Sequence, residues 1–140
     1  MTISHVRTVR LDWLGKGMRF RAVGIEPATP AIEIDGDGNS GPSAMITLLF
    51  AAAGCSGSDV VSILQKMRVQ LAQVSIEVRG QRREEEPRRY LAVHYRYQIS
   101  GDGIDQAKAE RAVSLSLEKY CSVVHSLAPD IKVTHEVVLA

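Results

Sequence analysis

A long apolar segment in the first half of the chain limits the folds that this sequence can adopt. Residues 43–54 are apolar nearly all round and end in Ala51-Ala52-Ala53-Gly54, a run of small side chains. Because small side chains let another helix approach closely, this segment predicts a buried helix. Such a helix has more apolar surface than one sheet face can cover, which favours a dimer. The apolar run is shorter than the roughly 20 residues needed to span a bilayer.

The composition is that of an ordinary globular protein. The 140 residues are 45% hydrophobic and 24% charged, and this length fits a single domain over residues 1–140. A formal net charge of +1 gives no overall attraction to nucleic acid or to an anionic membrane, so we expect neither partner. Residues 1–10 lack the apolar core of a signal peptide, which predicts a cytoplasmic location.

The pattern of apolar residues and turn formers predicts an α+β fold. Alternation with a period of two indicates strands, whereas recurrence every three or four residues indicates helices. The predicted elements are strands over 6–14, 18–23 and 31–35, a helix over 43–54 with a second or kinked helix continuing to about 68, strands over 74–79 and 91–99, a helix from about 106 to 124, and a strand over 131–137. The predicted order is therefore β-β-β-α-α-β-β-α-β around a buried central helix.

A glycine-rich loop, Gly36-Asp37-Gly38-Asn39-Ser40-Gly41-Pro42, precedes the long apolar helix. Its Gly-x-Gly-x-x-Gly spacing matches the dinucleotide fingerprint, but Asp35 and Asp37 would bring negative charge to a pyrophosphate, and no parallel βαβ unit is predicted. The loop also begins like a calcium site, but Ser40 stands where glycine is required and Ile46 where a bidentate glutamate belongs. We interpret the segment as a plain turn.

Metal and hydrolase signatures are missing from the sequence. Its four histidines, His5, His94, His125 and His135, show no spacing that would pair them on one helical face or with cysteines as zinc ligands. No Gly-x-Ser-x-Gly nucleophile motif occurs either. We expect no metal and no bound cofactor.

The two cysteines, Cys55 and Cys121, are the remaining candidates for chemistry. In a reducing compartment such a pair is more often buried, catalytic or redox-active than structural. Cap-type residues after Cys55 place it at the start of the second helix segment, where backbone N–H groups and the helix dipole favour the reactive thiolate. Cysteine is also among the most buried residue types, so this position alone is compatible with simple packing.

The segments around both cysteines resemble the motifs of a known family. The stretch Gly41-Pro42-Ser43-Ala44-Met45-Ile46-Thr47-Leu48-Leu49-Phe50-Ala51-Ala52-Ala53-Gly54-Cys55-Ser56-Gly57-Ser58-Asp59-Val60-Val61 resembles the first cysteine motif of the OsmC/Ohr family. The segment Glu118-Lys119-Tyr120-Cys121-Ser122-Val123-Val124-His125-Ser126-Leu127 resembles the second. The separation of the cysteines, 121 − 55 = 66 residues, and the predicted element order also suit this family of osmotically inducible and organic hydroperoxide resistance proteins.

This resemblance implies a thiol-dependent peroxidase that reduces organic hydroperoxides in oxidative stress defence. By analogy, Cys55 is the peroxidatic thiol that becomes sulfenic acid, and Cys121 resolves it by forming a disulfide. An external dithiol then restores both thiols by exchange. The family also implies an intertwined homodimer with its two sites at the interface.

The resemblance further implies an arginine from the N-terminal hairpin that holds the thiolate and the developing oxyanion. Arg19 is the candidate for this role, and Arg21 on the same strand face is the alternative. The family's hydroperoxide reductases orient this arginine with a glutamate ten residues before the first cysteine, where this chain has Met45. The orienting ion pair is therefore missing or supplied from elsewhere.

The departure at Met45 keeps two other hypotheses open beside the peroxidase. One is a non-enzymatic dimer that senses redox changes or binds a small ligand with the same fold. The other is a protein in which Cys55 and Cys121 only pack, so that replacing Cys55 changes stability alone.

Overall fold

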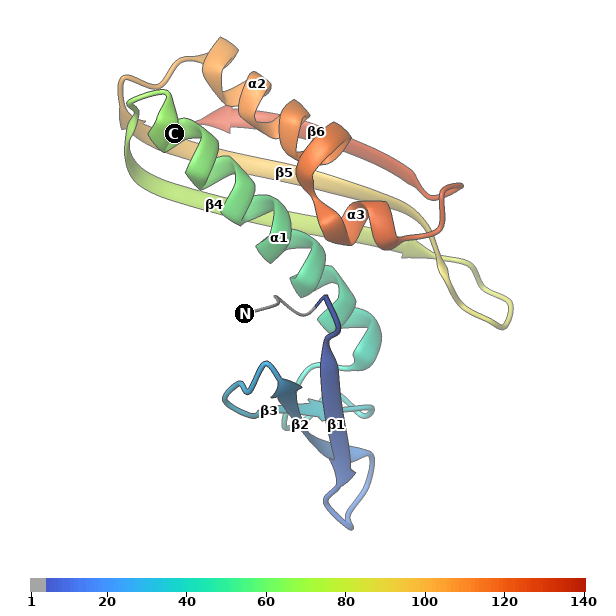
Figure 1. The fold of residues 1–140 in the computed structure, drawn as a ribbon. Helices are drawn as coiled ribbons and strands as arrows, with labels where there is room; N and C mark the ends of the chain where they lie inside the picture. The colour runs from blue at the N-terminus through green and yellow to red at the C-terminus, as the bar shows by residue number, and fades with distance from the viewer. Residues whose placement is uncertain (1–4) are drawn as a thin grey trace. The chain divides into compact units, whose positions relative to one another are not determined.

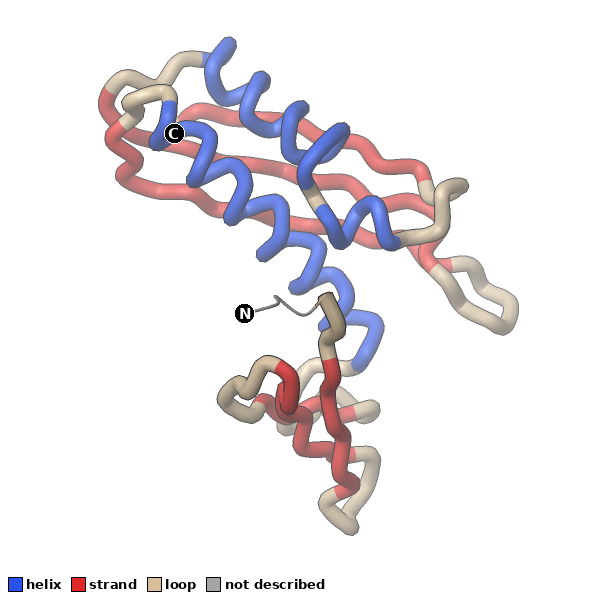
Figure 2. Tube along the Cα trace, in the orientation of Figure 1, coloured by secondary structure: helices blue, strands red, loops and turns tan. Residues whose placement is uncertain are grey.

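The computed structural model describes residues 5–140 and divides into two units, of which the first ends at Leu48 and the second runs from Leu49 to Ala140. The elements, shown in Figure 1 and by type in Figure 2, are β1 Thr8–Trp13, β2 Arg19–Glu26, β3 Ile32–Asp35, α1 Ala44–Lys66, β4 Gln70–Arg82, β5 Tyr90–Asp102, α2 Gln106–Leu115, the π-helix η1 Ser116–Tyr120, α3 Ser122–Ser126 and β6 Lys132–Leu139. The predicted α+β class is confirmed. Within the described residues the strands form two three-stranded sheets.

The N-terminal unit is an antiparallel sheet with the strand order β1-β2-β3. Gly15 and Gly17 lie between β1 and β2 with φ values of 81° and 56°, a left-handed conformation that side chains disfavour. All six side chains of β1 are exposed, and Val9 and Trp13 keep 77% and 62% of their surface accessible. This unit therefore has a large apolar surface that its own residues do not cover.

Asp35 organises the glycine-rich loop that follows β3. Its carboxylate is 2% exposed and accepts hydrogen bonds from the backbone N–H groups of Asp37, Asn39 and Ser40 at 2.9, 3.1 and 3.0 Å. The N–H groups of Ser40 and Asp37 lower the pKa of Asp35, because hydrogen bonds favour the charged form. The donors that a phosphate-binding loop would offer to a ligand are thus already bound to the chain's own carboxylate.

The C-terminal unit is a sheet with the strand order β4-β5-β6, in which β4 and β5 are antiparallel and β5 and β6 are parallel. A parallel pair needs a long crossover connection, which α2, η1 and α3 supply. Figure 1 shows these helices on the same face of the sheet as the C-terminal half of α1. The core on this face contains Val93, Tyr95, Tyr97 and Ile99 from β5, each at most 1% exposed.

Helix α1 runs without interruption through Cys55, so the predicted joint at this residue is wrong. Ser56 and Ser58, interpreted from the sequence as helix caps, lie within the helix instead. Ser58 donates a hydrogen bond to the carbonyl of Gly54 one turn earlier, and Ser56 is buried against the sheet. Cys55 therefore lies in the middle of α1, and the argument that a helix start favours its thiolate does not hold.

The burial predicted for this helix is also wrong for the chain taken alone. Only a stripe one residue wide, at Ala52, Ser56, Val60 and Leu64, is buried, whereas Phe50 is 62% exposed. By length and mean hydropathy, α1 is the one helix of the described residues that could cross a membrane. With 23 residues, α1 is longer than the apolar segment 43–54 of the sequence. The buried stripe packs on the C-terminal sheet, and Asp59 adds a carboxylate within the helix, a residue type that is rare in membrane spans.

We predict that the charge of Asp35 holds its loop in place. Asp35→Asn should speed amide hydrogen exchange at Asp37, Asn39 and Ser40 at neutral pH, because an amide is a weaker acceptor than a carboxylate. A lowered folded-state pKa means that this stabilisation is complete above the ordinary aspartate pKa of about 3.9 and is lost as pH falls through the lower value. The difference from the parent should therefore shrink in acid.

The exposed neighbour Asp37 offers a matched control for this experiment. Asp37→Asn should leave exchange in the loop close to that of the parent. Equal exchange in Asp35→Asn and the parent at neutral pH would contradict the prediction.

Candidate functional site

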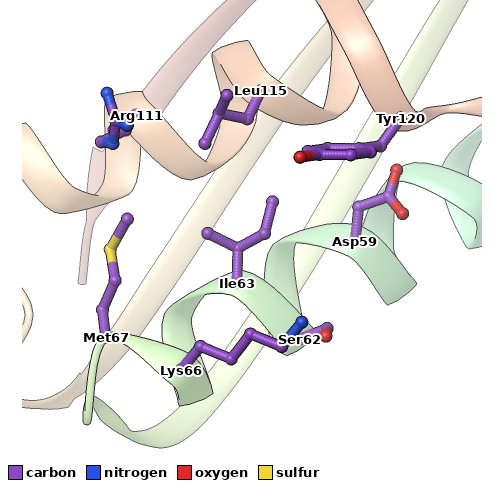
Figure 3. Close-up of a pocket in the computed structure, with 8 residues that line it drawn as sticks. All are labelled: Asp59, Ser62, Ile63, Lys66, Met67, Arg111, Leu115 and Tyr120. Atoms are coloured by element: carbon purple, nitrogen blue, oxygen red, sulfur yellow. The ribbon is translucent and has the colours of Figure 1, made fainter.

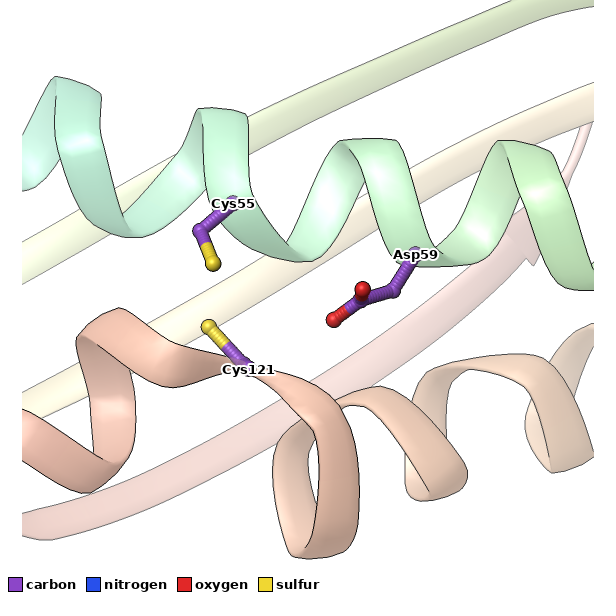
Figure 4. A group of neighbouring side chains, drawn as sticks. All are labelled: Cys55, Asp59 and Cys121. Carbon is purple, nitrogen blue, oxygen red and sulfur yellow. The ribbon is translucent and has the colours of Figure 1, made fainter. Parts of the chain in front are cut away.

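The structure brings the two cysteines together with a carboxylate. The sulfur atoms of Cys55 and Cys121 and a carboxylate oxygen of Asp59 all lie within 4.8 Å of one another. Both thiols are free, and Figure 4 shows the two sulfurs pointing toward each other. Cys55 and Asp59 are four residues apart on α1, a spacing that puts side chains on one face of a helix.

A π-turn places Cys121 opposite α1. The helix predicted from about 106 to 124 is correct in its start, where Asp105 caps α2 by accepting a hydrogen bond from the N–H of Lys108 at 2.8 Å. The predicted helix is not continuous, because α2 ends at Leu115 and the π-helix η1 follows it. The N–H of Cys121 donates to the carbonyl of Ser116 at 2.7 Å, and Cys121 itself is extended, with φ −71° and ψ 102°. The helix is thus interrupted at Cys121 by a π-turn, a feature that is frequent at functional sites.

The two thiols have different surroundings. Cys121 is fully buried, and this burial raises its pKa to about 11, with a smaller effect in the same direction from Cys55. The backbone N–H of Val124 acts in the opposite direction. Cys121 is therefore held as a neutral thiol at physiological pH. Cys55 is only half-buried, so a solute can reach it more readily.

A chain of buried hydroxyl groups ends at Asp59. Ser116 donates to the Asp59 carboxylate at 2.9 Å, Ser56 lies 2.8 Å from Ser116, and the Tyr97 hydroxyl lies 2.6 Å from Ser56. Each hydroxyl has one hydrogen and a carboxylate only accepts, so the donors must run from Tyr97 through Ser56 and Ser116 to Asp59. Burial raises the pKa of Tyr97, which keeps it a donor.

Asp59 also lines a pocket in the C-terminal unit. The pocket, shown in Figure 3, has a volume of about 440 Å³ and is lined by Asp59, Ser62, Ile63, Lys66, Met67, Arg111, Leu115 and Tyr120. Figure 3 places Asp59 beside Tyr120 at one end and Arg111 at the other, with Ile63 and Leu115 between them. The pocket thus combines an apolar middle with charged groups at its ends.

Arg19 lies in the N-terminal unit and is ion-paired there. Its Nε and Nη2 atoms donate to the two carboxylate oxygens of Glu33, both at 3.0 Å. This bidentate pair raises the pKa of Arg19 and lowers that of Glu33. Arg19 therefore has a carboxylate partner, Glu33 on β3, in a chain that carries Met45 ten residues before Cys55. The alternative candidate, Arg21, is exposed.

Cys55, Asp59 and Cys121 are also the one group in the described part of the chain whose donor atoms could together hold a metal ion. Two sulfurs and one oxygen suit zinc, with a fourth position left open. Such binding needs both thiols ionised, which the raised pKa of Cys121 opposes. No sequence motif signals this group, because Cys55 and Cys121 lie 66 residues apart in the chain and none of its three members is a histidine.

Comparisons with known proteins identify the family of this chain. Residues 36–136 match the family model of OsmC-like proteins. The chain belongs to the OsmC-like family. It is 40% identical over 134 residues to protein YhfA of Escherichia coli strain K12, an alignment that covers 94% of this chain and 98% of YhfA. The resemblance inferred from the two cysteine motifs is confirmed.

Solved structures extend the similarity to the fold. A hypothetical protein from Aquifex aeolicus VF5 has a TM-score of 0.82 at 31% identity and covers 98% of this chain and 99% of its own. The organic hydroperoxide resistance protein OhrB of Bacillus subtilis has a TM-score of 0.63 at 14% identity, covering 95% and 98%. The likeness to OhrB concerns the fold alone.

Three site residues were not identified from the sequence. Asp59, interpreted as a helix cap, could have been found from its spacing of four residues after Cys55. Ser116 and Glu33 carried no comparable signal, because the first depends on the π-turn and the second on the pairing of β3 with β2.

We predict that the buried hydroxyl of Ser56 stabilises the fold around the thiols. Ser56→Ala should lower the free energy of unfolding by about 1–3 kcal/mol, because it leaves the buried Tyr97 hydroxyl without its partner. The matched control is Ser58→Ala on the exposed side of α1, which should change stability by no more than about 0.5 kcal/mol. Urea denaturation of both variants tests this, and equal effects of the two changes would contradict it.

Proposed function

We propose that this protein reduces organic hydroperoxides with its two thiols. The observation that supports this most strongly is the approach of the Cys55 and Cys121 sulfurs to within 4.8 Å across two different elements. Packing alone does not require two sulfurs and a carboxylate to converge at one point. Membership of the OsmC-like family adds to this support.

The reaction would use the two thiols in sequence. The Cys55 thiolate attacks the O–O bond, the alcohol leaves after taking up a proton, and Cys55 becomes sulfenic acid. Cys121 then displaces water from the sulfenic acid and closes the disulfide, and an external dithiol reduces it by exchange. The half-buried position of Cys55 suits the thiol that meets the substrate, and the full burial of Cys121 suits the resolving thiol.

Arg19 remains our candidate for the cation that holds the thiolate and the leaving oxygen. Its bidentate pair with Glu33 fixes the orientation of the guanidinium. In the family's hydroperoxide reductases, a glutamate at the position of Met45 orients the arginine in this way. The apolar middle of the pocket beside Asp59 suits the organic part of a hydroperoxide. A cytoplasmic location would keep both thiols reduced.

We also propose that the protein acts as a homodimer. Large apolar side chains stay exposed on both sides of the unit boundary, including Val9, Leu11 and Trp13 on β1 and Ile46 and Phe50 on α1. Monomeric proteins rarely expose so many large apolar side chains, and a second copy of the chain would cover them.

Sedimentation equilibrium should therefore give twice the chain mass of 15.3 kDa. Phe50→Glu should shift the protein toward the monomer, because it puts a charge on the exposed apolar surface without touching the core of the chain. The control Ala128→Glu, in the exposed loop before β6, should leave the dimer intact. A parent protein that is monomeric at all concentrations would contradict the proposal.

The activity test is consumption of an organic hydroperoxide and of hydrogen peroxide by the reduced protein with a lipoyl-type dithiol. We expect turnover that prefers the organic substrate and falls at least about 10³-fold in Cys55→Ser, because that variant lacks the nucleophile. Mass spectrometry of the oxidised parent should find a Cys55–Cys121 disulfide. Oxidised protein that keeps both thiols free would contradict the proposal.

Met45 favours a second candidate function, a redox-sensing or ligand-binding dimer without turnover. This protein would form the same disulfide once, rapidly and stoichiometrically, but would not cycle with any dithiol. If instead Cys55→Ser changed only stability, both thiols would serve packing alone.

A further inference from the structure

We infer that Asp59 is the proton-transfer residue of the disulfide-forming step, taking the proton from the Cys121 thiol and giving it to the hydroxyl that leaves Cys55. The inference rests on the proposed function and assigns a role to a residue outside the thiol pair. It concerns the second chemical step, which needs a base, and not the first, which needs a cation.

The position of Asp59 is the first argument. A carboxylate oxygen lies within 4.8 Å of both sulfurs, and Figure 4 shows the side chain directed toward the space beside them. The spacing of four residues on α1 fixes Asp59 on the same helix face as Cys55. The carboxylate can therefore serve both reacting groups without a large movement.

The buried thiol is the second argument. Attack on a sulfenic acid requires the Cys121 sulfur as a thiolate, but burial raises its pKa to about 11. A neighbouring base is needed to remove the proton as the S–S bond forms. In this step the S–H bond of Cys121 and the S–O bond of Cys55 break, one S–S bond forms, and the proton and the hydroxyl leave as water. No further oxidant or reductant is required.

The hydroxyl chain is the third argument. Ser116 donates to Oδ2 of Asp59, and within the described residues no hydrogen bond is made to Oδ1. Ser56 and Tyr97 point their hydrogens along the same chain toward the carboxylate. The hydrogen bond from Ser116 thus holds one oxygen in place and leaves the other oxygen able to accept a proton.

The experiment follows the two steps separately in protein treated with one equivalent of an organic hydroperoxide and no dithiol. In Asp59→Asn, the step from the Cys55 sulfenic acid to the disulfide should slow by about 10²-fold or more, and its rate is measured separately from loss of the Cys55 thiol. The sulfenic acid should then accumulate and be trapped by dimedone, as in Cys121→Ser. The control Asp130→Asn changes an exposed carboxylate and should form the disulfide at the parent rate.

A pH profile separates proton transfer from a structural effect. The titratable groups around Cys121 are Cys55, Asp59, Tyr95 and Tyr97. Without the base, disulfide formation should accelerate steeply as pH rises toward the raised pKa of Cys121. In the parent the same step should depend on pH much less. Asp59→Glu, which keeps a carboxylate, should recover part of the rate.

Disulfide formation at the parent rate in Asp59→Asn would overturn the inference. A second pattern would also overturn it. If disulfide formation is slow in Asp59→Asn, does not accelerate as pH rises and is not restored in Asp59→Glu, the role of Asp59 is merely structural. Failure of the proposed function has a different signature, because the parent itself would then yield no trapped sulfenic acid and no disulfide.

Discussion

The hydrogen bonds of Ser56 connect the three elements on which the site depends. Its buried hydroxyl joins α1 to Tyr97 of β5 on one side and to Ser116 of η1 on the other. A polar group this deep costs stability unless it is satisfied, so the three elements are held in one arrangement. That arrangement fixes the approach of α1 to the crossover segment, and with it the separation of Cys55 and Cys121.

The same constraint explains why the site residues come from an irregular part of the crossover. A regular helix through Ser116 would continue past Cys121 and keep it on the helix surface. The π-turn ends the helix at this residue, and the extended backbone of Cys121 places its sulfur opposite Cys55. The hydroxyl of Ser116, the first residue of the π-turn, donates to Asp59 on α1.

The sequence was sufficient for the order of the strands, for the helical regions between them and for the two cysteines, because periodicity and spaced motifs are local properties. It was insufficient where tertiary contacts reverse a local preference. Ser56, Ser58 and Asp59 have the composition of a helix cap, yet Ser56 faces the core and the helix continues. Likewise, Glu33 could not be assigned to Arg19, because their pairing depends on which strands are neighbours and on a diagonal reach across them.

The charges of the molecule suit the two steps of the proposed reaction in different ways. The first step develops negative charge on sulfur and oxygen, for which we propose the guanidinium of Arg19, whose orientation is held by Glu33. The second step must remove a proton from a buried thiol, for which a cation is of no use and a carboxylate is suitable. A chain that has Met45 in place of the family's glutamate but carries Asp59 beside its thiols therefore contains both kinds of charge that the proposed two-step reaction would use.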